Sequence, residues 1–177
     1  MAIVKAYGEP MAFLSKYNPD YQMRICNNTD ECLFGNYPTL GKLTWYGKNM
    51  PKAWMLAQLT DLSEYCGCKD KLEGRALEHC AEIITQRYNY LKISEIMLFI
   101  FRFKAGDYGK FYGSVDPLTI TTSLNRFIID RNILIDKHEQ KQRELRDAED
   151  KKNCISYAEY LRIKAEKEVS GTNQTIN

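Results

Sequence analysis

Apolar residues recur at helical spacing along most of the chain after Pro51, and this periodicity constrains the fold more than any other feature. Met55, Leu59 and Leu62 follow one another at intervals of three or four positions until Gly67. Such spacing places apolar side chains on one face of a helix. Because proline suits a first helical turn and glycine commonly follows a last one, the pattern predicts a helix between Pro51 and Gly67.

Two more helices are predicted downstream. Asp70 and Glu73 have the spacing of a capping box and precede a second apolar stripe, formed by Leu77, Cys80, Ile84, Tyr88 and Leu91. A third helix is expected to begin at Ser94, as N-cap, and to end before Gly106, where a left-handed residue is favoured. Its segment Ile96 to Phe101 is apolar throughout, so we expect it to be the most buried. A buried strand is the alternative for this segment, but no second alternating run offers a partner.

A fourth helix is predicted to start at Asp116 and Pro117, which suit the N-cap and first helical positions. Its inner face is expected to carry Leu124, Ile128, Arg131 and Ile135. Residues 136–168 then contain nine basic and nine acidic residues, so this part has no net charge. It is expected to be a solvated helix that supports at most weak self-association, interrupted near Asn153 and restarted by a capping box at Ser156.

These patterns predict an all-α protein, a compact helical bundle with an irregular N-terminal arm and an extended, charged C-terminal helix. Proline, glycine and asparagine interrupt the N-terminal region, so we expect turns and brief elements there. The expected divisions are an N-terminal arm packed on the core at 1–50, a helical core at 51–135, a charged helical extension at 136–170 and a disordered tail at 171–177.

Charge and histidine content argue against several function classes. Lys and Arg total 25 and Asp and Glu total 23, which leaves a formal net charge of +2, far from the strongly basic balance of a dedicated nucleic-acid-binding domain. The chain has two histidines and no Walker, dinucleotide-binding or nucleophile-elbow motif. We therefore expect a protein that is not an enzyme and needs no cofactor, with an unrecognised active site as the less favoured alternative.

The sequence also indicates a cytoplasmic protein without a membrane partner. Residues 1–8 lack the apolar core of a secretory signal. The longest apolar run, Ile96 to Phe101, is too short to cross a bilayer. The six cysteines are accordingly expected to be reduced thiols rather than a disulfide framework.

Aromatic and basic residues alternate around a glycine turn at 106–109, which makes this turn the strongest candidate binding site. The predicted contact residues are Arg102, Lys104, Tyr108, Lys110, Phe111 and Tyr112. Cations hold phosphates and flat rings stack on unpaired bases, so the segment predicts contact with single-stranded DNA. The structural alternative assigns the aromatic rings to the core and the glycines to an ordinary helix connection. The turn also matches the GxxG loop of KH modules, although Asp107 would repel a phosphate.

Two other groups of residues have structural explanations that we favour. Zinc could in principle be held by Cys66, Cys68, His79 and Cys80. Their spacing differs from that of a zinc ribbon, and two of the cysteines lie on apolar stripes, so no metal site is predicted. An ion pair from Arg102 to Asp116 or Asp130 is a simpler explanation of that arginine than catalysis.

Three segments carry a family resemblance: GNYPTLGKL, LSEYCGCKDKL and YLKISEIMLFIFRFKAGDYGKFYGSVDPLTITTSLNRFI. Together, over residues 35–135, they resemble an uncharacterised family found in bacterial mobile elements and phages, with FKAG-YG-FYGSVDP as the most specific part. The resemblance implies no catalytic residues.

By analogy with other small helical proteins of such elements, the resemblance implies a non-enzymatic accessory protein of DNA replication or transfer. Such a protein would resemble a helicase loader or an organiser and contact a partner protein and single-stranded DNA. The alternative is an interaction factor that inhibits a host enzyme or defence system without binding nucleic acid.

Overall fold

The computed structural model describes residues 2–66, 72, 74–109, 116–154 and 157–172. Within these residues every regular element is a helix, and the only extended pairing is an isolated bridge between Thr39 and Lys92. The predicted all-α class is therefore confirmed. The chain divides into two compact units, Met1–Ile133 and Leu134–Asn177, and each is described by itself.

The N-terminal residues of the first unit form brief elements, as expected for a region interrupted by proline and asparagine. They are α1 (Ala2–Tyr7), α2 (Pro10–Lys16), η1 (Pro19–Tyr21), α3 (Gln22–Cys26), α4 (Thr29–Phe34) and η2 (Leu40–Trp45). Asn18 and Asn28 start new elements because their side-chain oxygens accept backbone N–H groups at the helix N-termini. This region also supplies core residues, including Phe13, Cys32, Leu33, Leu40 and Leu43.

The next two helices are α5 (Met50–Tyr65) and α6 (Gly74–Arg87), which pack against each other. The helix predicted from Pro51 is confirmed, and its buried residues include Trp54, Met55, Leu59 and Leu62. On α6, Cys80 and Ile84 are buried, as the apolar stripe predicted. The expected capping box at Asp70 and Glu73 lies outside the described residues.

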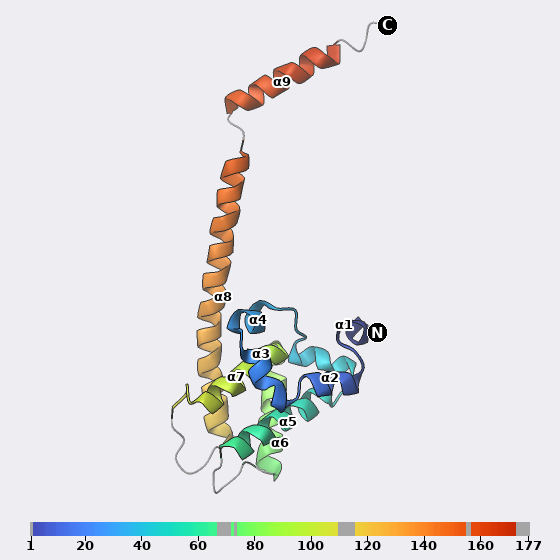
Figure 1. Ribbon diagram of the computed structural model, residues 1–177, viewed down its shortest axis with the longest axis vertical. Helices are drawn as coiled ribbons and strands as arrows, with labels where there is room; N and C mark the ends of the chain where they lie inside the picture. Colours follow the sequence, from blue (N-terminus) through green and yellow to red (C-terminus); the bar gives the residue numbers. More distant parts are fainter. Residues whose placement is uncertain (1, 67–71, 73, 110–115, 155–156, 173–177) are drawn as a thin grey trace. The chain divides into compact units, whose positions relative to one another are not determined.

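Helix α7 (Ile93–Ala105) lies at the centre of the first unit, with α3, α4 and α5 packed against it (Figure 1). Every residue from Ile93 to Ile100 is buried, so the predicted central helix is confirmed and the strand alternative is wrong. The helix ends at Gly106, whose φ of 88° is left-handed, a conformation that glycine adopts without a Cβ clash.

The prediction that Ser94 caps this helix is wrong, because Lys92 occupies the N-cap position. Ser94 lies inside the first turn, and its hydroxyl donates to the backbone carbonyl of Cys32 over 2.7 Å. The backbone N–H of Lys92 donates instead to Glu95 Oε2, at 2.8 Å. A serine that serves a neighbouring helix is indistinguishable from a cap in sequence alone.

Helix α8 (Pro117–Asn153) begins as predicted. The Asp116 carboxylate accepts the backbone N–H of Thr119 over 2.7 Å, which is the bond expected of an N-cap. In the first unit, Ile120, Leu124 and Phe127 of this helix are buried in the core.

The second unit contains the remainder of α8 and α9 (Tyr157–Thr172). Helix α8 ends at Asn153, where an interruption was expected. Helix α9 includes Gly171 and Thr172, which the sequence placed in a disordered tail. Ser156 and residues 173–177 lie outside the described part of the chain. Among the described helices, none is sufficiently long and apolar to cross a membrane.

Candidate functional site

The glycine turn that follows α7 contains the predicted binding site, of which the structure describes only part. Gly106 and Gly109 both have left-handed φ values, 88° and 105°, so the backbone of this turn adopts conformations that favour glycine. Of the predicted contact residues, Arg102, Lys104 and Tyr108 are described. The other three, Lys110, Phe111 and Tyr112, lie outside the described residues.

Lys104 is engaged in a structural ion pair rather than presented to solvent. Its ammonium group lies against the Asp61 carboxylate and donates to Gln22 Oε1 over 2.8 Å. It also lies 5.3 Å from the centre of the Tyr65 ring. The Lys104 side chain is 15% exposed. A phosphate would have to displace these partners to reach it.

Lys104 is the last member of a hydrogen-bond network that joins the N-terminal elements to α5. Gln22 Nε2 donates to Gln58 Oε1 over 2.7 Å, and Gln58 Nε2 donates to the carbonyl of Tyr17 over 3.1 Å. The indole N–H of Trp54 donates to the same carbonyl over 2.8 Å. Because Gln22, Gln58 and Trp54 are buried, the loss of any partner would strand a polar group away from water.

The Tyr108 ring packs against the end of α7. Its centre lies 5.6 Å from that of Phe99 and 6.1 Å from that of Phe103. Burial raises the pKa of Tyr108 to about 12, and the Arg102 guanidinium opposes this shift only in part. The hydroxyl is buried without a hydrogen-bond partner among the described residues. This ring therefore contributes to the core rather than standing free to stack on a base.

Arg102 has a different partner from the one expected. The predicted ion pair with Asp116 or Asp130 is absent from the described part of the chain. The guanidinium of Arg102 lies 5.9 Å from the centre of the Phe127 ring, an arrangement that favours a cation.

A small pocket of about 250 Å³ lies beside this arginine. It is lined by two arginines and two aspartates, together with one tyrosine and one isoleucine: Arg102, Arg126, Asp107, Asp130, Tyr108 and Ile129. Because its positive and negative side chains are equal in number, the pocket offers no net attraction for a phosphate.

Two of the cysteines considered for zinc binding lie on a helix or at its end. Cys80 is buried on α6, and burial raises its pKa to about 11. Cys66 is half-buried at the end of α5, and Cys68 lies outside the described residues. Across the residues that are described, no group of three or more potential metal ligands comes together.

Large apolar side chains on the first part of α8 point away from the core. Leu118, Ile129 and Ile133 are 74%, 61% and 47% exposed. Their spacing along a helix places them on one side, opposite Leu124 and Phe127. We call Leu118, Ile129 and Ile133 the outer face of α8. In the sequence, these residues form a further set of apolar positions at helical spacing. The sequence analysis missed them because it considered only the apolar positions expected to face the core.

Helix α9 carries a comparable surface in the second unit. Tyr157, Tyr160 and Leu161 are 76%, 50% and 45% exposed, and their spacing places them on one side of the helix. The rings of Tyr157 and Tyr160 are stacked with centres 6.5 Å apart. We call these three residues the α9 face.

Comparison of the sequence with known protein families gives a match. Residues 74–170 match the Family of unknown function (DUF6633). The chain belongs to this family. The match is consistent with the resemblance to an uncharacterised family, and it extends from α6 into α9, over both exposed apolar faces. No curated protein and no solved structure matches the chain.

Proposed function

We propose that this protein is a non-enzymatic accessory protein that acts by binding a partner protein through the outer face of α8 and the α9 face. The exposure of large apolar side chains on these two surfaces carries the proposal. Burying apolar area contributes about 25 cal/mol of free energy per Å². Neighbouring exposed apolar residues, such as Ile129 with Ile133 and Tyr157 with Tyr160 and Leu161, mark interaction sites more often than isolated ones do.

The length of α9 supports the same conclusion. Its 16 residues only just exceed the ~12–15 below which an isolated helix is marginal in water, and most of the stability of helices in proteins comes from packing of an apolar face. Contact with a partner would bury Tyr157, Tyr160 and Leu161 and so stabilise the helix itself.

The state of the glycine turn argues against nucleic-acid binding at that place. Lys104 is held by Asp61 and Gln22, and the Tyr108 ring is packed on phenylalanines. These contacts remove two of the groups that a DNA strand would use there.

The biological setting we propose is a phage or mobile element, with action in DNA replication or transfer in the cytoplasm. This setting rests on the family resemblance of residues 35–135. The alternative is a factor that inhibits a host enzyme or defence system without binding nucleic acid. Neighbouring helicase or primase genes would support the replication setting, and neighbouring genes of defence inhibitors would support the alternative.

Cross-linking in native host cells, followed by reconstitution with the purified partner, tests the proposed binding surfaces. Two variants remove them separately: Leu118→Ser with Ile129→Ser and Ile133→Ser, and Tyr157→Ser with Tyr160→Ser and Leu161→Ser. We expect calorimetry to show at least about tenfold weaker binding for one or both, since a tenfold loss needs only about 1.4 kcal/mol.

A matched control changes two exposed apolar residues outside both faces, Ile83 and Tyr90, which are 48% and 50% exposed. The variant Ile83→Ser with Tyr90→Ser should bind the partner like the unchanged protein. Unchanged affinity in both face variants, or a loss equal to that of the control, would refute the proposed surfaces.

A further inference from the structure

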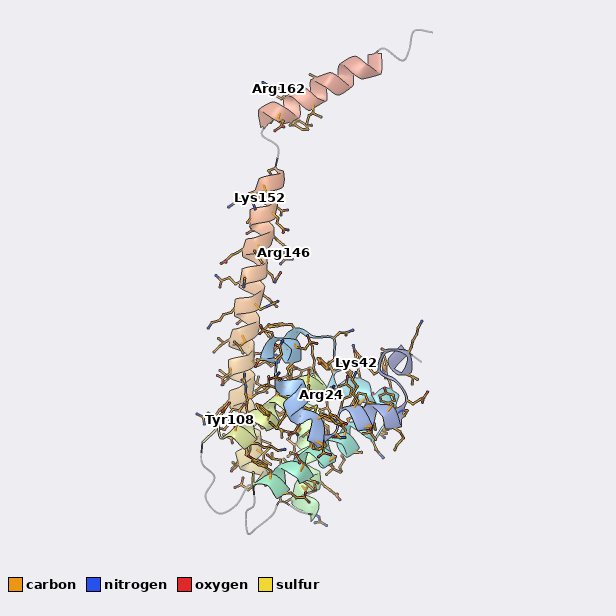
Figure 2. The ribbon with its side chains drawn as sticks, in the orientation of Figure 1. Arg24, Lys42, Tyr108, Arg146, Lys152 and Arg162 are labelled. Carbon is orange, nitrogen blue, oxygen red and sulfur yellow. The ribbon has the colours of Figure 1, made fainter. Side chains whose placement is uncertain are left out.

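A groove of about 790 Å³ lies in the N-terminal part of the first unit, lined by residues of α2, α3 and the start of α4. Its volume is in the range of sites that bind small molecules or short chain segments. Figure 2 shows Arg24, which lines this groove, well apart from Tyr108 of the glycine turn. The groove is therefore separate from the site that the sequence predicted.

Three tyrosines line the groove, and one of them, Tyr17, is held in place by contacts with its neighbours. Tyr17 is 3% exposed, and its ring meets that of Tyr37 edge-on with centres 6.2 Å apart. The backbone carbonyl of Tyr17 accepts hydrogen bonds from the buried side chains of Trp54 and Gln58. A ligand would thus meet a preformed surface and would not have to order it.

Two cations line the groove without a carboxylate partner. The Lys16 ammonium lies 5.3 Å from the centre of the Tyr17 ring, and Arg24 is exposed on α3. Within the described residues no ion pair joins either of them to an acid. Glu31 is the one acidic residue of the lining, so positive charge is in excess.

Tyr21 supplies a ring that a ligand can reach. It lies on η1, between Lys16 and Arg24 in the chain, lines the groove and is 41% exposed. The nearby Asn27 is also exposed and lines the groove, which adds an amide able to donate to and accept from a base edge.

We propose that this groove binds single-stranded DNA, with phosphates on Lys16 and Arg24 and a base stacked on Tyr21. A positive groove with an accessible aromatic ring has the two features that such binding requires. An acidic peptide would use the cations but would leave the ring without a flat partner. The assignment uses neither the outer face of α8 nor the α9 face, so it stands or falls independently of partner binding.

Fluorescence anisotropy of the full chain with a labelled oligothymidylate of about 15 nucleotides tests the proposal. Two phosphate contacts predict that the logarithm of the affinity falls with the logarithm of salt concentration with a slope of roughly −1.4, at about −0.7 per contact. Absence of binding at low salt would overturn the proposal.

A charge variant, Lys16→Ala with Arg24→Ala, should reduce affinity at low salt by at least about tenfold and bring the slope close to zero. The matched control, Lys48→Ala with Arg75→Ala, removes the same two charges from exposed positions outside the groove. It should keep the slope. An equal loss in both variants would show that binding follows net charge alone and would refute the groove.

A ring variant separates stacking from charge. Tyr21→Leu should weaken binding by about 5- to 150-fold, the usual contribution of one stacked base, while the salt slope stays unchanged. The control Tyr90→Leu changes an exposed tyrosine that follows α6 in the chain and does not line the groove. It should leave the affinity for the oligonucleotide unchanged. Unchanged binding by Tyr21→Leu would contradict the assigned stacking. Thermal unfolding of each variant checks that the fold is retained.

Competition identifies the ligand. Unlabelled oligothymidylate should displace the probe, whereas thymidine monophosphate and polyglutamate should not do so at comparable concentration. Displacement by the mononucleotide with equal affinity would assign the groove to a free nucleotide instead. Displacement by polyglutamate would assign it to an acidic peptide, and tenfold tighter binding of oligouridylate would assign it to RNA.

Discussion

Breaking the ion pair between Glu95 and Arg131 should be among the most destabilising single changes in the first unit. Arg131 Nε donates to Glu95 Oε1 over 2.7 Å, and the other carboxylate oxygen accepts the Lys92 backbone N–H. The Glu95 side chain is 0% exposed and that of Arg131 is 16% exposed. The pair therefore joins α7 to α8 in a place that water scarcely reaches.

Replacing Arg131 with alanine should lower the free energy of unfolding by about 3 to 5 kcal/mol, because it leaves a buried carboxylate without its countercharge. Total stabilities of such units are about 5 to 15 kcal/mol, so the loss is a large fraction. At a urea dependence of about 1.5 kcal/mol per molar, the midpoint should fall by roughly 2 to 3 M.

Tryptophan fluorescence in urea is a suitable assay, because both tryptophans of the chain, Trp45 and Trp54, lie in the first unit. The double variant Glu95→Leu with Arg131→Met should be less destabilised than Arg131→Ala, since apolar groups then replace both charges. A loss of less than about 1 kcal/mol in the free energy of unfolding of Arg131→Ala would refute the reasoning. So would a loss in the double variant equal to the summed losses of Glu95→Leu and Arg131→Met measured separately.

Four other changes test further contacts described above. Lys104→Ala should cost about 2 to 3 kcal/mol in urea unfolding, because it breaks charged hydrogen bonds, while Lys48→Ala should stay within about 0.5 kcal/mol. Burial raises the pKa of the Cys80 thiol from 9.0 to about 11. The contribution of this thiol to stability is therefore fully present below pH 9 and is lost as pH rises toward 11, because the unfolded chain releases the proton first. Between pH 8 and pH 10, the free energy of unfolding should fall by about 1 kcal/mol more in the unchanged protein than in Cys80→Ala. Truncation after His138 should leave the thermal midpoint within roughly a few degrees, whereas Leu124→Ala should cost about 2 to 5 kcal/mol by calorimetry.

Local patterns in the sequence were enough to predict the helices that follow Pro51. Proline at the start of α5, Gly106 after α7 and the Asp116 cap of α8 act through bonds or conformations within a few residues. Such signals are complete in a short window of sequence. The central position of α7 also followed from local composition, because a helix apolar on every side can only be buried.

The role of Lys104 could not be predicted in this way. Its partners Asp61 and Gln22 lie 43 and 82 positions away in the chain, and nothing in their own segments marks them as its ligands. Ser94 was misassigned for the same reason, since its acceptor at Cys32 is 62 positions away. In both cases a polar side chain near a helix end suited a local or functional role, and the tertiary fold used it elsewhere.

The continuity of α8 has a consequence for how the two C-terminal helices form. The first turns of α8 are fixed by the core through Ile120, Leu124 and Phe127, so the costly nucleation step is complete and each later residue needs only to propagate the helix. Helix α9 begins after Asn153 has ended that helix, and it must nucleate on its own. Amide hydrogen exchange should therefore be fastest in α9, and its helicity should rise when a partner is bound.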